Sequence, residues 1–262
     1  MLLSNPEPAW LTPDTHRRFV QAKSSVKASA DQAQVTHLWR QRNRVDSILE
    51  RPPGPWYEFV SQHFRIRLVG ITPQGDPCIL VKMCDMKRLA DAIRAGKGSL
   101  HDLEQHMAFI NEYLYKVACP VPLPGGMGVQ IIDCAGARLS MINSDTANAF
   151  KVFASFGMYY PERMAKAIVV NAPGWFDMPW RVAQGMLDEN TRSKVVLEWD
   201  TRKLLGVLGD VLGPENVPLE YGGPCAAALE EYPEMLRLDA FVAELRSGAR
   251  PYERVAAATP QP

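Results

Sequence analysis

The chain has 262 residues and equal numbers of basic and acidic side chains, 29 of each, so its formal net charge is zero. This balance excludes a global field that would collect nucleic acid or an anionic membrane, so any electrostatic function must be local. The five cysteines form no CxxC pair and several lie in apolar runs, which favours buried free thiols in a reducing compartment. Because the start lacks a signal-peptide h-region and the chain has no run of about 20 apolar residues, we expect a soluble, cytoplasmic protein.

Residues 1–55 form the first of three expected regions and are helical or irregular. Prolines make the first dozen residues irregular, and apolar spacing predicts a helix from about Asp31 to Glu50. The run 51–55 contains three prolines and ends this helix. The predicted helix carries three arginines at alternate positions, Arg40, Arg42 and Arg44. Residues two apart do not share one helix face, which favours a solvated surface over a nucleic-acid site.

Strands alternate with helices from Trp56 onward, in a second region expected to span 56–223. Strands are predicted at 64–71, 78–83, 129–133 and 167–170, and helices at 85–95, at 99–119 and from Ser144. The last helix carries one apolar face, formed by Ala147, Phe150, Phe153, Ala154 and Gly157. The pattern predicts an α/β fold with a mixed, mostly parallel sheet. The third region, 224–262, is expected to hold a helix around 235–245 and a flexible tail.

The sequence lacks the common motifs of catalysis and metal binding. The glycines of 125–128 precede a strand, whereas a dinucleotide-binding loop follows one, and no GxSxG nucleophile elbow exists. The nearest approach to a metal cluster comprises His101, Asp102, Glu104 and His106. On a helix, His101 and His106 are five residues apart and diverge, so we expect no metal site and no enzyme activity.

The segment after Asn171 is unusually apolar. Ala172, Pro173 and Gly174 break the preceding strand, and Asp177 can cap a short helix. Apolar side chains cover this segment nearly all round: Trp175, Phe176, Met178, Trp180, Val182 and Met186. Such a helix is either buried in the core or lies between an apolar ligand and a membrane or partner.

Several long motifs resemble the CRAL-TRIO phosphatidylinositol-transfer family. The fifteen residues 159–173, YYPERMAKAIVVNAP, are similar to the family signature almost residue for residue. They are followed, in order and at family-like distances, by LDENTRSKV at 187–195 and PENVPLEYGG at 214–223, and preceded by IDCAG at 132–136. The resemblance is strong from about Gly126 to Gly223 and extends back to Phe64.

The resemblance implies a lipid cavity above the sheet, closed by a mobile gate helix, with no cofactor other than the bound lipid. Glu162 and Lys194 match the residues that bind the inositol phosphate headgroup. Arg138 lies where phosphatidylcholine-binding relatives carry a small hydroxyl residue, and Ser140 keeps a hydroxyl nearby. The six apolar residues of 175–186 named above would form the gate and contact a membrane.

We therefore expect a monomeric carrier of one phospholipid, most simply phosphatidylinositol, that touches membranes transiently. Two alternatives stay open. One is a lipid sensor or scaffold that binds lipid without transferring it. The other is a carrier of a different apolar cargo, such as a tocopherol, a retinoid or a sterol-like molecule. The N-terminal region lacks the family's leucine- and arginine-rich helix, so its contribution to a headgroup site is unassigned.

Overall fold

A computed structural model describes residues 8–177, 180–181 and 189–258 of the chain. Its sheet has five strands in the order β1-β2-β3-β4-β5, with bounds Arg67–Ile71, Pro77–Lys82, Gly128–Asp133, Met164–Val170 and Val195–Glu198. Strands β1 and β2 form an antiparallel hairpin, and β2 to β5 run parallel. The predicted mixed, mostly parallel α/β fold is confirmed.

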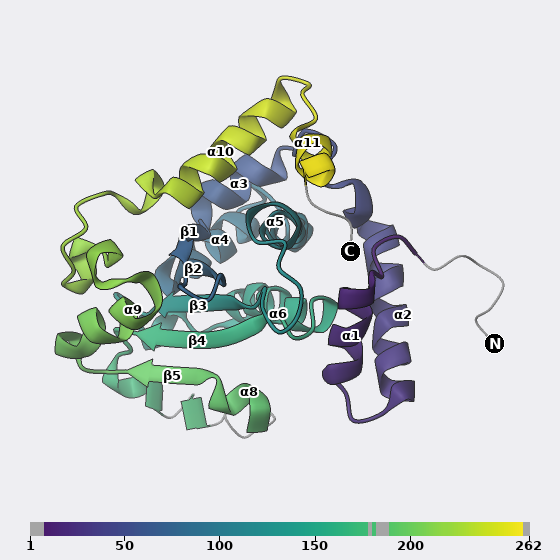
Figure 1. Cartoon of the computed structure of the whole chain (residues 1–262). Coiled ribbons are helices and arrows are strands. Elements are labelled where there is room, and N and C mark those ends of the chain that lie inside the picture. Colours follow the sequence, from purple (N-terminus) through teal and green to yellow (C-terminus); the bar gives the residue numbers. More distant parts are fainter. Residues whose placement is uncertain (1–7, 178–179, 182–188, 259–262) are drawn as a thin grey trace.

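Helices surround the sheet. Figure 1 shows α1 and α2 at the right, on the side of the tails of the β3 and β4 arrows, and α10 at the top next to α3. The N-terminal helices are α1 (Pro13–Gln21), α2 (Val26–Asn43) and α3 (Trp56–His63). The middle of the chain contributes α4 (Met83–Arg94), α5 (Leu100–Tyr113, continued by a π-helical turn Leu114–Ala118), α6 (Ser144–Tyr159) and α8 (Glu189–Ser193). The last are α9 (Leu204–Leu212), α10 (Pro233–Arg246) and α11 (Pro251–Ala258).

The predicted elements after Trp56 are largely where the sequence places them. Helix α5 starts at a capping box in which Ser99 and Asp102 satisfy each other's backbone N–H groups. The first strand is shorter than predicted, because Phe64 ends α3 and the strand starts only at Arg67. Helix α3 itself was not predicted.

The N-terminal region differs most from the prediction. The expected helix at 31–50 starts earlier, at Val26, and ends at Asn43, where Arg44 adopts a left-handed conformation with φ 50°. Arg40 is buried, with 4 % of its surface exposed, so its predicted position on a solvated surface is wrong. Its guanidinium lies 2.8 Å from the buried carboxylate of Glu112, a partner that helix periodicity alone cannot reveal.

Two hydrophobic cores cover the two faces of the sheet. The smaller lies between one sheet face and α9, and its strand residues Cys78, Leu80, Ile131 and Ile168 are completely buried. The larger joins α2 to α6 with α10, and contains Trp39, Phe109 and Phe241, among others. Residues from all three predicted regions therefore share one core.

Candidate functional site

The turn between α6 and β4 brings together the two residues matched to a headgroup. Glu162 lies just before β4 and Lys194 just before β5, so the parallel pairing of these strands places both at the same edge of the sheet. Lys194 Nζ lies 3.5 Å from Glu162 Oε2, and each side chain is about one-fifth exposed. The pair is thus accessible and offers a phosphate a cation and a hydroxyl group an acceptor.

The backbone of this turn is strained and is held by the N-terminal helix. Glu162 adopts φ 50°, a left-handed conformation that a side chain with a Cβ rarely takes. Arg18 of α1 donates from Nη1 to the Glu162 carbonyl oxygen at 2.6 Å and from Nη2 to the Gly125 carbonyl oxygen at 2.8 Å. Its Nε also bonds to Asp14 at 2.8 Å, and only 1 % of Arg18 is exposed. One buried guanidinium therefore fixes the turn that presents Glu162.

Arg163, the next residue in the motif, is directed at the loop before β3. It donates to the Gly126 carbonyl oxygen, and its guanidinium lies 4.3 Å from the centre of the Tyr115 ring. Burial, with the nearby positive charge of Arg18, lowers the pKa of Arg163 to about 10. The role of Arg163 is to anchor the turn to the loop before β3.

Arg138 and Ser140 lie at the opposite edge of the sheet. Both are exposed and follow the carboxyl end of β3, whereas Glu162 and Lys194 precede the amino ends of β4 and β5. Six strand residues separate the two edges, which at about 3.3 Å per residue corresponds to roughly 20 Å. The structure therefore divides the four headgroup candidates into two pairs that one headgroup does not span.

The two faces of the sheet are unequally covered. In the central strands, residues facing α9 are sealed. On the other face Val81, Ala167 and Val169 are also buried, whereas Ile79, Gln130 and Ile132 are only half-buried. Helix α6 buries Ala149 and Phe156 but leaves its predicted apolar face largely open, with 47 % of Phe150 exposed. Both α6 and the strands β2 and β3 thus carry apolar side chains that the larger core covers only in part.

The start of the predicted gate follows β4 directly. Trp175 and Phe176 lie in a short 3₁₀ turn, Gly174–Phe176, and are half-buried with Trp180. The Phe176 ring lies 6.3 Å from that of Trp199, which follows β5 and is 42 % exposed. Met178, Val182 and Met186 fall outside the described residues. Trp199 is an apolar contact that the sequence interpretation missed, and an aromatic residue directly after an edge strand was its only signal.

A buried polar network fixes the start of this segment to the end of the sheet. Asp133, which ends β3 and is 2 % exposed, accepts hydrogen bonds from the Asn171 amide and the Tyr221 hydroxyl, each at 2.9 Å. Asn171 also adopts a left-handed conformation with φ 53°. The network joins three of the recognised motifs, and because every partner is satisfied its role is structural.

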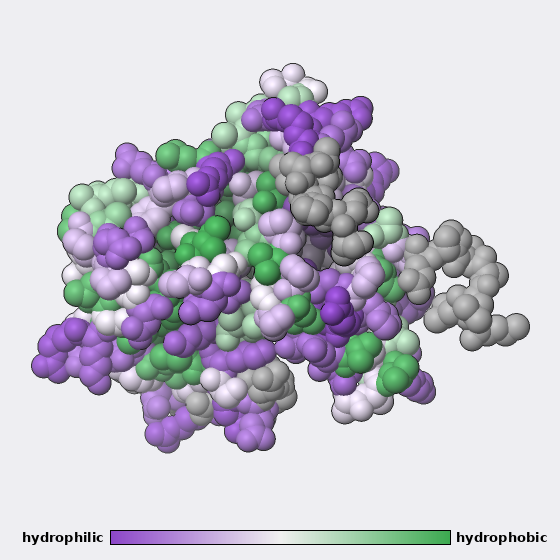
Figure 2. Space-filling view, viewed as in Figure 1, coloured by the Kyte–Doolittle hydropathy of each residue, from purple (hydrophilic) through white to green (hydrophobic). Residues whose placement is uncertain are grey.

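Within the described parts of the chain, no group of three or more His, Cys, Asp or Glu side chains could hold a metal ion. His101 is exposed near Glu104 whereas His106 is buried, so the two histidines face apart as their spacing predicts. Among the helices described, none combines the length and the apolar character needed to cross a bilayer. Figure 2 shows hydrophilic and hydrophobic residues interspersed over the face in view.

Comparison with known proteins identifies relatives over most of the chain. The CRAL/TRIO domain matches residues 63–223. Sec14 cytosolic factor of Schizosaccharomyces pombe is 24% identical over 79% of this chain and 73% of its own length. The phosphatidylinositol/phosphatidylcholine transfer protein SFH11 of Arabidopsis thaliana is 24% identical over 82% of this chain and 58% of its own length.

Two further relatives are similar to this chain over part of their length or in fold alone. Protein real-time of Drosophila melanogaster is 26% identical over 74% of this chain, and the match spans only 29% of that longer protein. The crystal structure of Sfh5 superposes with a TM-score of 0.60 at 15% identity, over 79% of this chain and 71% of that one. The Sfh5 likeness concerns the fold alone.

Proposed function

The chain belongs to the CRAL/TRIO family, and on that premise we propose that it binds one phospholipid of the phosphatidylinositol class and exchanges it at membranes. The observation that carries this proposal is the uneven covering of the sheet, which leaves the apolar faces of α6 and of β2 and β3 partly open on one side. Apolar surface of this kind suits acyl chains. The relative SFH11, whose name states phosphatidylinositol and phosphatidylcholine transfer, supports the same ligand class.

The headgroup of this lipid would lie at the sheet edge formed by Glu162 and Lys194. The 3.5 Å distance in their ion pair is long, and both side chains are partly exposed, so the pair is worth little to stability. A lipid phosphate could replace Glu162 as the partner of Lys194 with little loss of free energy. The Glu162 carboxylate could then accept hydrogen bonds from inositol hydroxyls. Arg138 and Ser140, at the other edge, would contact a headgroup only in a different binding mode.

The energetics of acyl chains favour exchange at a bilayer surface. Burial is worth about 0.8 kcal/mol per CH₂, so two chains with about thirty methylenes would cost on the order of 20 kcal/mol to expose to water. Release must therefore occur while the binding surface is open to a bilayer. We propose that Trp175, Phe176 and Trp180, with Met178, Val182 and Met186, form the gate and insert at the membrane interface.

A lipid-transfer assay between liposomes tests headgroup and gate together. Replacing Lys194 by Ala should slow phosphatidylinositol transfer about tenfold and leave phosphatidylcholine transfer, if present, within twofold, because only one charge-assisted contact is lost. Replacing Trp175 and Phe176 by Ala should slow transfer of every lipid, because both act at the membrane rather than on the headgroup.

Lys97→Ala is the matched control, since it removes one exposed positive charge after α4, far along the chain from the site. Equal transfer by wild type and Lys194→Ala would remove Lys194 from the headgroup site. Stoichiometric lipid binding without any transfer by the wild type would favour a lipid sensor or scaffold. Retention of a non-phospholipid cargo, unaffected by Glu162 or Lys194 substitutions, would favour a carrier of another apolar molecule.

A further inference from the structure

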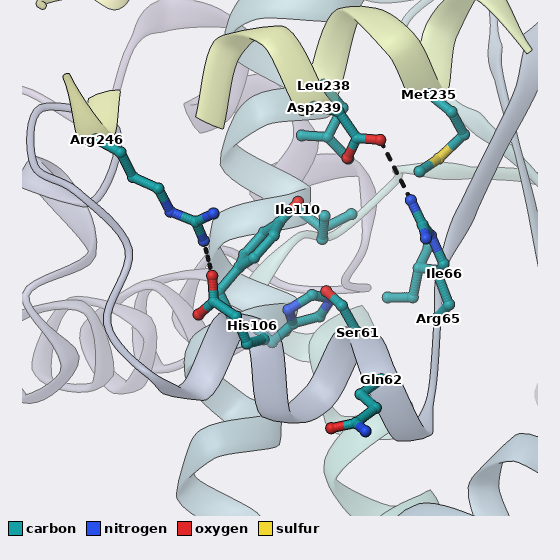
Figure 3. A pocket seen from close by; sticks show the side chains of 12 residues that line it. Ser61, Gln62, Arg65, Ile66, His106, Ile110, Met235, Leu238, Asp239 and Arg246 are labelled. Atoms are coloured by element: carbon teal, nitrogen blue, oxygen red, sulfur yellow. Dashed lines mark hydrogen bonds and ion pairs between the residues drawn. The ribbon is translucent and has the colours of Figure 1, made fainter. Parts of the chain in front are cut away.

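A cavity lies between α3, α5 and α10, and none of the proposed lipid-exchange elements (Glu162, Lys194 and the turn 174–176) lines it. Its volume is about 420 Å³, which lies within the usual range of small-molecule pockets. Figure 3 shows Ile110 and His106 of α5 below Leu238 and Asp239 of α10, with Ser61 beside His106 and Arg65 at the right. The CRAL/TRIO match begins at residue 63 and ends at 223, so α3 before it and α10 after it supply much of the wall.

Two ion pairs cross the mouth of this cavity and cancel its charge. Arg246 of α10 pairs with Glu58 of α3, and Asp239 of α10 pairs with Arg65 at 3.2 Å (Figure 3). With two cations and two carboxylates already matched, a charged ligand would have to break a pair, whereas a neutral one need not. Pairs this exposed are worth only about 0.2–1 kcal/mol each, so they can open to admit a ligand.

His106 supplies an unsatisfied polar group in the cavity wall. The residue is 2 % exposed and lines the cavity, and its Nδ1, which is shielded from solvent, has no hydrogen-bond partner among the residues that the structure describes. Burial, reinforced by the positive charge of Arg65, lowers the pKa of the imidazole to about 3, so the ring is neutral at physiological pH. A neutral ring nitrogen donates or accepts according to tautomer, and a hydroxyl group can match either state.

The remaining wall is apolar. Ile66, Ile110, Met235 and Leu238 surround the space, and the Tyr57 ring lies 5.1 Å from that of His106. We propose that this cavity is a binding site for a neutral, hydroxylated molecule with a small apolar or aromatic body, its hydroxyl group bonded to His106. The proposal is independent of lipid carriage, because no residue of the lipid-exchange elements lines the cavity.

Phenol and toluene are suitable probes, because they share a ring and differ by one hydroxyl group. Imidazole resonances of the intact protein, assigned with a His106→Leu variant, would be followed by NMR during titration. We expect a saturable shift of the His106 signals with phenol and binding of toluene that is about fivefold weaker, the ratio typical of one neutral hydrogen bond. His106→Leu should remove the preference for phenol while leaving the fold intact by circular dichroism.

A second variant tests the proposal independently of whether His106→Leu folds. Ser61→Trp adds a bulky ring at the half-buried wall and should abolish phenol binding while His106 is retained. Three outcomes would each overturn the proposal. They are a His106 signal that does not respond to phenol, equal affinities for phenol and toluene, and a bound water at Nδ1 with no response to the probe. Because the readout is the His106 signal, its failure leaves the lipid proposal untouched.

Discussion

At the residue scale, the Glu162 turn depends on a side chain 144 positions earlier in the sequence. Arg18 donates to the Glu162 carbonyl oxygen and to the loop before β3, and Asp14 holds its guanidinium in place. A left-handed residue is stable only where its surroundings impose it. The conformation that presents the Glu162 carboxylate is therefore imposed from α1, in the region where no family motif was recognised.

Replacing Arg18 by Ala should lower the free energy of unfolding by about 3 kcal/mol, because buried carbonyl oxygens lose their donor and Asp14 loses a partner. The neighbouring Arg17→Ala is a matched control: Arg17 is exposed, and its loss should cost less than about 0.5 kcal/mol. Urea unfolding of both variants measures the difference. Equal stabilities would show that α1 does not hold the turn.

At the element scale, α2 is tied to α5 by a buried charge network. Arg40 Nη1 lies 2.8 Å from Glu112 Oε1, and Lys116 and the Tyr160 hydroxyl bond to the same carboxylate at 2.6 and 2.7 Å. Burial alone would raise the pKa of Glu112, but Lys116 and Arg40 outweigh it and lower the pKa to about 2. Stability from this carboxylate is present above its unfolded pKa of about 4.3 and is lost as the pH falls toward 2.

The Glu112→Gln variant should therefore be less stable than wild type at pH 7 and lose less stability between pH 5 and pH 3. The exposed Glu50→Gln variant should follow the wild-type profile. Urea unfolding at pH 7, 5 and 3 gives all three curves. Parallel curves for wild type and Glu112→Gln would contradict the assignment of this pH dependence to the network.

Local patterns explain why the elements of the sheet could be predicted. The uninterrupted apolar run 167–170 predicts a strand buried on both faces, and it pairs with a parallel neighbour on each side. Helix α3 was missed because Trp56–His63 is only 8 residues long, too short for its periodicity to be distinct. Arg40 was misplaced because its partner Glu112 lies 72 positions away, beyond the reach of any local pattern.

Part of the candidate site was predictable for the same reason. Glu162 and Lys194 each precede one of two adjacent parallel strands, so motif matching and strand order together place them side by side. Arg18 could not be predicted, because nothing near it distinguishes a buried arginine from a surface one. The split between Glu162 with Lys194 and Arg138 with Ser140 follows from the sheet topology rather than from residue type.

At the scale of the whole molecule, one α/β sheet separates a sealed face from a partly open one. Helix α9 closes the first face, whereas on the second face the larger core, to which α6 contributes, leaves Ile79 and Ile132 half-buried. Elements before and after the family domain, α2 and α10 above all, share the larger core with it. A cavity whose charged side chains are paired lies between α3, α5 and α10, and Glu162 does not line it.

Native mass spectrometry is the most direct test of the central claim that this chain carries a single phospholipid. The 29.2 kDa protein is incubated with mixed phosphatidylinositol and phosphatidylcholine liposomes and then separated from them. Its mass spectrum should show one added lipid mass per chain, and the bound lipid should be enriched in phosphatidylinositol. The Lys194→Ala variant should keep one lipid but lose that enrichment. A wild-type protein that stays empty after incubation would contradict the claim.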